Sequence, residues 1–116
     1  MRRGKEIAQG SHASMAFLTA PLRGQNLDGS GPFGLELTEE QRQWIAVGMA
    51  KVCLRVNSEE ELLSYHKKAL EAGLTSHVIT DSGRTEFGGV PTITACAIGP
   101  HILPSIDAIT GDLTPY

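Results

Sequence analysis

The sequence predicts a small three-layer α/β domain, with helices on both faces of a central sheet. Three observations predict it: apolar residues recur at helical spacing near the start, two helix-start signals follow, and β-rich runs alternate with the helices. The 116 residues have the length of one domain, so we expect residues 1–116 to form a single unit. An apolar fraction of 41% is that of an ordinary globular protein.

The first predicted helix covers residues 5–18, because its apolar residues fall near one helical face. These residues are Ile7, Ala8, Met15 and Leu18. The following stretch is rich in Gly, Pro, Asn and Asp, which favour turns over regular structure. We therefore expect a flexible loop at about residues 20–36.

Two capping boxes predict the next helices. Residues 38–41 (Thr-Glu-Glu-Gln) open a helix through Trp44 to about Met49, since the Thr and Gln side chains can satisfy each other's backbone donors. Residues 58–61 (Ser-Glu-Glu-Glu) open another, which Gly73 suits as its C-terminal cap.

Three β-rich runs complete the predicted layers. Residues 52–56 and 77–80 flank a helix, and this order predicts a right-handed βαβ unit with two parallel strands. Residues 92–98 are apolar enough for a central strand. Pro104 then starts a short last helix that Gly111 ends.

Composition excludes several classes of protein. No apolar run is long enough to span a bilayer and no secretory signal pattern opens the chain, so we expect no membrane partner. Cys53 and Cys96 stand alone in apolar runs, which predicts buried free thiols in a reducing cytoplasm. A formal net charge of −3 argues against broad nonspecific nucleic-acid binding, although basic residues crowd the start.

The first candidate cluster lies at this basic start. Arg2, Arg3 and Lys5 oppose the dipole of the helix they begin, which makes sense if an anion binds there. The alternative is a solvated basic segment. Gln9 and His12 share a helix face beside them, and the small neighbours of His12 predict that it is buried and positional.

The second cluster follows the run 77–80. Asp81 stands at the carboxyl end of a predicted strand, where ligand sites collect in parallel sheets, with Arg84 and Thr85 beyond it. The alternative is an ordinary Asx turn. Alternation puts Thr92 and Thr94 on one face of their strand, where they either line a site or occupy a wet face.

Other constellations are missing from the sequence. His66, His77 and His101 lie apart without a metal-ligand pattern, so we expect no metal and no cofactor. No Ser-His-Asp or Cys-His arrangement is readable either.

Four segments in series carry a resemblance to a known family. They are GKEIAQGSHAS at 4–14, DSGRTE at 81–86, TITACAIGP at 92–100 and ITGDLTPY at 109–116. Each is weak alone, but their order and spacing together resemble the archaeal and eukaryotic type (type 2) of peptidyl-tRNA hydrolase over essentially the whole chain outside the Gly-rich loop. The resemblance implies a mixed, mostly parallel sheet of four strands, whose first strand we expect to be missing or truncated here.

The resemblance also implies an activity and its residues. The family hydrolyses the ester that joins a peptide to the 3′ end of tRNA, releasing both for recycling in the cytoplasm. Lys5, Asp81, Thr85 and Thr94 match its motif positions and are the implied catalytic residues. We expect Asp81 to position or activate water while Lys5 and a threonine hydroxyl stabilise the oxyanion.

The implied substrate-binding residues surround that set. They are Arg2, Arg3, Gln9, His12 and Arg84, with the arginines on the terminal phosphates of peptidyl-tRNA. The resemblance further implies a homodimer. Two alternatives stay open: a non-catalytic or differently specific member of the same fold that binds a small anionic or RNA ligand, and a structural α/β domain that acts only as an oligomer.

Overall fold

The computed structural model describes residues 1–23, 25, 34–84 and 87–116. In these parts of the chain, four helices and two strands follow one another. They are α1 (Arg3–Leu22), α2 (Glu39–Val47), α3 (Glu59–Glu71), β1 (Ser76–Asp81), β2 (Thr92–Ile98) and α4 (Leu103–Thr110).

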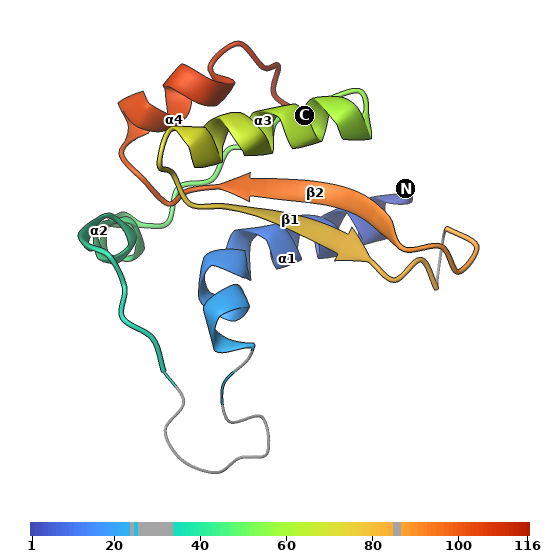
Figure 1. Cartoon of the computed structure of the whole chain (residues 1–116), viewed down its shortest axis with the longest axis horizontal. Coiled ribbons are helices and arrows are strands. Elements are labelled where there is room, and N and C mark those ends of the chain that lie inside the picture. The colour runs from blue at the N-terminus through green and yellow to red at the C-terminus, as the bar shows by residue number, and fades with distance from the viewer. Residues whose placement is uncertain (24, 26–33, 85–86) are drawn as a thin grey trace.

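The two strands form one antiparallel sheet with helices on both sides. Helix α1 packs against both strands from one side, and α3 packs against both from the other (Figure 1). Helix α4 packs against α3 (Figure 1). Side chains of the sheet therefore face either α1 or α3, and this division decides where the site lies.

Helix α1 is longer than the predicted helix over residues 5–18, and the prediction of a loop from residue 20 is wrong at its start. The helix begins at Arg3 and continues through Pro21 to Leu22. Pro21 lies in the last turn, where its missing N–H and its ring disturb little helix beyond it. Residues 24 and 26–33 of the predicted flexible loop lie outside the described residues.

The buried face of α1 differs from the apolar face predicted for it. Its buried residues are Gln9, Ala13, Ala16 and Phe17, which follow helical spacing. In contrast, Ile7 and Met15 are 64% and 53% exposed. The polar Gln9 is buried because its amide makes hydrogen bonds to the sheet, which hydrophobic spacing cannot indicate.

Both predicted helix starts are confirmed. The Thr38 hydroxyl accepts from the Gln41 N–H at 3.2 Å, and the Gln41 side chain accepts from the Thr38 N–H at 2.9 Å. Ser58 accepts from the Glu61 N–H at 3.1 Å, but the Glu61 carboxylate accepts from the N–H of residue 57, so the second capping box is only half formed. Helix α2 docks on α1 through an edge-to-face pair of Phe17 and Trp44, with ring centroids 5.6 Å apart.

The predicted strand at 52–56 and the parallel βαβ unit are wrong. Only an isolated antiparallel bridge joins Leu54 to Pro115, flanked by backbone hydrogen bonds from Arg55 N–H to the Thr114 carbonyl and from Tyr116 N–H to the Cys53 carbonyl. β propensity makes a strand only where a neighbouring strand completes the ladder, and here the neighbour is a three-residue segment. The sheet that forms is antiparallel, so its described part is not mostly parallel.

This correction changes the environment of the cysteines. Both are free, as predicted, but Cys53 is exposed because its segment joins no sheet. Cys96 is half-buried in β2, and burial raises the pKa of its thiol. On the α3 side of the sheet its sulfur lies 3.3 Å from the hydroxyl of Ser76, which in turn lies 2.6 Å from Nδ1 of His66.

The last predicted helix is confirmed, and the core is small. Pro104 lies in the first turn of α4 and Gly111 caps its end. The buried apolar residues are Ala13, Ala16, Phe17, Ala69 and Leu74, and no large side chain among the described residues is fully buried. None of the described helices combines the length and the hydropathy that crossing a bilayer requires.

Candidate active site

Asp81 is the centre of a polar site between α1 and the sheet. As the last residue of β1 it points its carboxylate toward the start of α1. Lys5 Nζ donates to Oδ1 at 2.7 Å, Gln9 Nε2 donates to the same oxygen at 3.4 Å, and the Gly83 N–H donates to Oδ2 at 2.8 Å. Both carboxylate oxygens are thus held, one by the helix and one by the turn after the strand.

Gln9 connects this carboxylate to β2. The hydroxyl of Thr94 donates to Gln9 Oε1 at 2.5 Å, and Gln9 is buried, with only 3% of its surface exposed. Because a primary amide both accepts and donates, Gln9 joins Thr94 to Asp81 in one hydrogen-bonded chain. The complete chain runs from Lys5 through Asp81 and Gln9 to Thr94.

An irregularity in the sheet brings Thr94 to this side. The strand pairing passes from Ile79–Ala95 directly to Thr80–Ile93. Thr94 therefore has no opposite residue and forms a β-bulge.

The bulge reverses the face that Thr94 would otherwise occupy. Cys96 faces α3, because its sulfur lies 3.8 Å from Nδ1 of His66 on that helix, and regular alternation would turn Thr94 to α3 as well. With the extra residue, Thr94 instead faces α1 and bonds Gln9. The bulge thus places a hydroxyl on the same side of the sheet as Asp81.

The turn after β1 depends on Gly83. Its φ of +80° is a conformation that side chains disfavour, and a Cβ built there would lie 2.0 Å from the Val90 carbonyl oxygen. Its own carbonyl accepts from the Phe87 and Gly89 N–H groups at 3.2 and 2.8 Å. This close packing aims the Gly83 N–H at Asp81.

The surroundings of Asp81 favour its charged form. The hydrogen bond from Lys5 lowers the pKa of the Asp81 carboxyl, the Gly83 N–H lowers it further, and the charges of Lys5 and His12 act in the same direction against partial burial. The side chains of Lys5 and Asp81 are 15% and 10% exposed. A surface hollow beside the pair is lined by Arg2, Gly4, Lys5 and Ala8.

The structure brings together four of the predicted site residues and leaves others at the periphery. Lys5, Asp81, Gln9 and Thr94 form the hydrogen-bonded chain. The prediction that His12 is buried is wrong, because its residue is exposed on α1 near enough to act on Asp81 through its charge. The three arginines predicted to bind substrate, Arg2, Arg3 and Arg84, are all exposed. Thr85 lies outside the described residues.

Two contributors were not predicted in these roles. The Gly83 N–H could have been found from the Asp-Ser-Gly order, which is typical of an Asx turn. The bulge at Thr94 had no signal in the sequence. Thr92, predicted to share the face of Thr94, donates to the Val90 carbonyl at 2.8 Å within the loop.

In the described parts of the chain, no three His, Cys, Asp or Glu residues gather as a metal site would require.

The fold and the site define a class of small α/β proteins in which a carboxylate–ammonium pair is held between a helix and an antiparallel strand pair. The family model described as "Peptidyl-tRNA hydrolase PTH2" matches residues 1–116. The chain belongs to this family, which confirms the resemblance of the four motifs.

Individual relatives agree with this assignment. The chain is similar to the peptidyl-tRNA hydrolase of Methanocaldococcus jannaschii, with 39% identity over 114 residues that cover 97% of this chain and 87% of the relative. It is 37% identical over 114 residues to that of Methanopyrus kandleri, covering 97% and 85%. A probable peptidyl-tRNA hydrolase 2 of Dictyostelium discoideum is 34% identical over 116 residues, covering all of this chain and 49% of the relative.

Proposed function

We propose that this protein hydrolyses the ester bond of peptidyl-tRNA and releases peptide and tRNA for recycling. Membership of the family and the names of the relatives support this activity. The observation that carries it is the Asp81 carboxylate, held at 2.7 Å by Lys5, which itself lines a shallow surface hollow. An ester is reactive enough for attack by an oriented water, so a covalent nucleophile is not required.

Asp81 orients the attacking water in this mechanism. Its lowered pKa keeps it a carboxylate at neutral pH, but the same shift makes it a weak base. A carboxylate has about four lone-pair positions, of which three accept from Lys5, Gln9 and Gly83. The remaining position suits one water, which Asp81 orients. As the water oxygen bonds to the ester carbon, its proton passes to Asp81 and then to the 3′ oxygen that leaves with tRNA.

Lys5 stabilises the negative charge that develops on the ester oxygen. Its ammonium group lies beside the proposed water position and is only 15% exposed, so its charge is less screened than that of a surface lysine. The catalytic role of Thr85 remains a prediction from its motif position.

Gln9 and Thr94 act within the protein in this proposal. The Thr94 hydroxyl proton is engaged by Gln9, and the amide of Gln9 is engaged on both ends. We therefore propose that the two residues hold Asp81 in its orientation. This role replaces the substrate contact expected for Gln9 and the catalytic contact implied for Thr94. His12, in contrast, is exposed on α1. It therefore keeps its proposed role of contacting the substrate.

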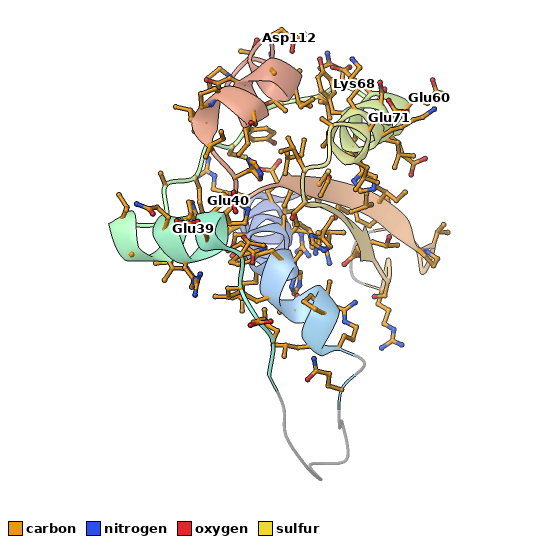
Figure 2. All side chains as sticks on the ribbon, turned by 60° about the vertical axis from the view of Figure 1, so that its left-hand side comes forward. Glu39, Glu40, Glu60, Lys68, Glu71 and Asp112 are labelled. Carbon is orange, nitrogen blue, oxygen red and sulfur yellow. The ribbon has the colours of Figure 1, made fainter. Side chains whose placement is uncertain are left out.

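The charge distribution suits a tRNA 3′ end on the α1 side. Arg2, Arg3 and Arg84 are exposed around the Lys5–Asp81 pair, where arginine forks can hold phosphates. In contrast, Glu60, Glu71 and Asp112 lie on the α3–α4 side of the sheet, across it from α1 (Figure 2). Lys68 lies on that side too, and Glu39 and Glu40 lie on α2, so the proposal rests on the three arginines and not on an overall polarity (Figure 2).

Finer points of assembly belong to the same proposal. Helices α1 and α3 on opposite sides support a three-layer α/β/α arrangement. The exposed Ile7 and Met15 of α1 support a homodimer, because exposed apolar groups on one helix face are stabilised by burial against a second copy. We propose the cytoplasm as its compartment, where translation supplies the substrate. A mass measurement in solution tests the dimer.

The test is the Asp81→Asn variant, which keeps the shape of the side chain and removes its charge. We expect hydrolysis of peptidyl-tRNA to fall by roughly 10²–10⁴-fold, the usual worth of a residue that handles the attacking water. The matched control is Asp112→Asn, whose carboxylate accepts from the Tyr65 hydroxyl at 3.1 Å, and which should keep wild-type turnover. Near-normal turnover by Asp81→Asn would contradict the mechanism, and tight binding without turnover by the wild type would favour the non-catalytic alternative.

A further inference from the structure

The first turn of α1 carries Lys5 and begins without a side-chain cap, because the N-cap residue Arg2 supplies none. Residues 1–4 are exposed, and the buried residues of α1 begin only at Gln9. Apolar packing therefore does not hold this turn in place, and helix ends without caps fray.

A contact from the other end of the sequence holds the turn. The phenol hydroxyl of Tyr116 donates to Oε1 of Glu6. Glu6 follows Lys5 directly and belongs to the same turn, so the two side chains leave the helix about 100° apart. Lys5 thus ties the turn to Asp81 on β1, and Glu6 ties it to Tyr116.

Tyr116 is itself held by backbone hydrogen bonds. Its N–H donates to the Cys53 carbonyl at 2.9 Å, and the bridge between Leu54 and Pro115 precedes it. These bonds do not involve its side chain. Removal of the phenol oxygen therefore breaks the link to Glu6 while the backbone pairing stays.

We propose that Tyr116 is a positioning residue, which through Glu6 holds the first turn of α1 so that Lys5 meets Asp81 in the active geometry. The inference rests on the proposed hydrolase function for its kinetic consequence, but not for its structural one. A carboxylate acceptor strengthens the phenol hydrogen bond, and a fraying first turn would otherwise move the ammonium group away from the ester.

The rival explanation is a direct contact of Tyr116 with the substrate. Its residue is 68% exposed, so the ring is accessible to a tRNA base. The two explanations differ in their dependence on Glu6. A positioning role acts only through Glu6, whereas stacking on a base needs the ring and not the carboxylate.

A double-mutant cycle of Tyr116→Phe and Glu6→Ala separates them. We expect each single variant to lower kcat by about three- to tenfold with little change in KM, and the double variant to be no slower than the slower single variant, because both remove the same link. The matched control is Tyr65→Phe, which removes a phenol hydrogen bond to Asp112 and should leave kcat unchanged. Additive losses, a rise in KM alone, or unchanged kcat in Tyr116→Phe would each overturn the proposal.

A second measurement does not depend on activity. The pKa of Asp81, followed by NMR of its carboxyl carbon, is held low by Lys5 in the wild type. We expect it to rise toward the ordinary value in Tyr116→Phe and to stay low in Tyr65→Phe. An unchanged Asp81 pKa in Tyr116→Phe overturns the inference. If the wild type does not hydrolyse peptidyl-tRNA, the proposed function fails, while this titration still decides the positioning role.

Discussion

At the scale of single residues, Asp81 fills both roles that its motif suggested. One carboxylate oxygen forms the Asx-type turn with the Gly83 N–H, and the other accepts from Lys5 and Gln9. The turn and the site are therefore not alternatives. The turn fixes the carboxylate so that α1 can use it, and the resulting hydrogen bonds keep its pKa low.

Gly83 is the residue at which the turn is most sensitive. In Gly83→Ala, we expect a loss of about 1–3 kcal/mol from the positive φ, increased by the contact of the new Cβ with the Val90 carbonyl. Because its N–H also holds Asp81, turnover should fall as well. Thermal unfolding and steady-state hydrolysis measure the two effects.

The control for this variant is Gly88→Ala. Gly88 has a φ of +60° but nothing within 4 Å of a built Cβ, so only the conformational cost applies. It should be less destabilised than Gly83→Ala and keep its activity. Equal effects of the two substitutions would contradict the importance of the close packing at Gly83.

Residue identities were predictable here, but their contacts were not. Lys5 and Asp81 were both found in motifs, and 76 positions separate them in the sequence. The sequence did not predict that Gln9 is buried, and it wrongly predicted that His12 is buried. Both residues lie on one helix face, and only the position of the sheet decides which of them is covered. Thr85 stays a prediction.

At the scale of secondary-structure elements, β2 shows how a bulge places a functional group. Without the extra residue at Thr94, its hydroxyl would face α3 and the Gln9 amide would lose its donor. Bulges occur next to active sites for this reason, since one inserted residue re-aims a side chain. Capping boxes were readable from the sequence, whereas a bulge needs knowledge of the partner strand.

The bulge makes a testable difference between two threonines. In Thr94→Val, we expect turnover to fall by roughly ten- to a hundredfold, because the loss of the hydroxyl frees Gln9 and with it Asp81. Thr94→Ser should recover most of the rate. Thr92→Val removes a hydroxyl that bonds only the Val90 carbonyl in the loop, and should stay near the wild-type rate. A Thr94→Val enzyme with unchanged kcat would remove Thr94 from the site.

The segment 52–56 gives the opposite lesson about elements. Its β-branched and apolar residues favour a strand, yet only Leu54 forms a bridge and Val52 is 74% exposed. The residues of β2 and of this segment both favour the β conformation. Only β2 has a neighbouring strand of full length in the described structure, so only β2 becomes a strand.

At the scale of the whole molecule, stability should depend on pH through His77. Its pKa is lowered by burial and by the charge of His66, and its Nδ1 is buried without a partner among the described residues. The unfolded chain therefore takes up a proton more readily, so this contribution to stability is present above the unfolded pKa of about 6.5 and falls as the pH drops below it.

Urea midpoints of the wild type and His77→Gln from pH 8 to pH 5 measure this contribution. We expect the stability of the wild type relative to the variant to decrease as the pH falls, because the glutamine carries no titrating group. The contribution of Asp81 to stability also decreases as the pH falls, but at lower pH. Its lowered pKa stabilises the fold above about pH 4, and this stabilisation is lost as the pH falls further. A constant difference between the two midpoints would show that His77 does not titrate differently in the folded state.

The sequence by itself determined the family, the helix starts and the chemical groups of the site. Each of these depends on residues that are neighbours in the chain: a capping box spans four positions, and each motif spans about ten. Only the tertiary structure decided that the described sheet is antiparallel, that Thr94 faces α1, and that Glu6 meets Tyr116. Strand pairing and bulges depend on which distant segments become partners, and no local propensity contains that information.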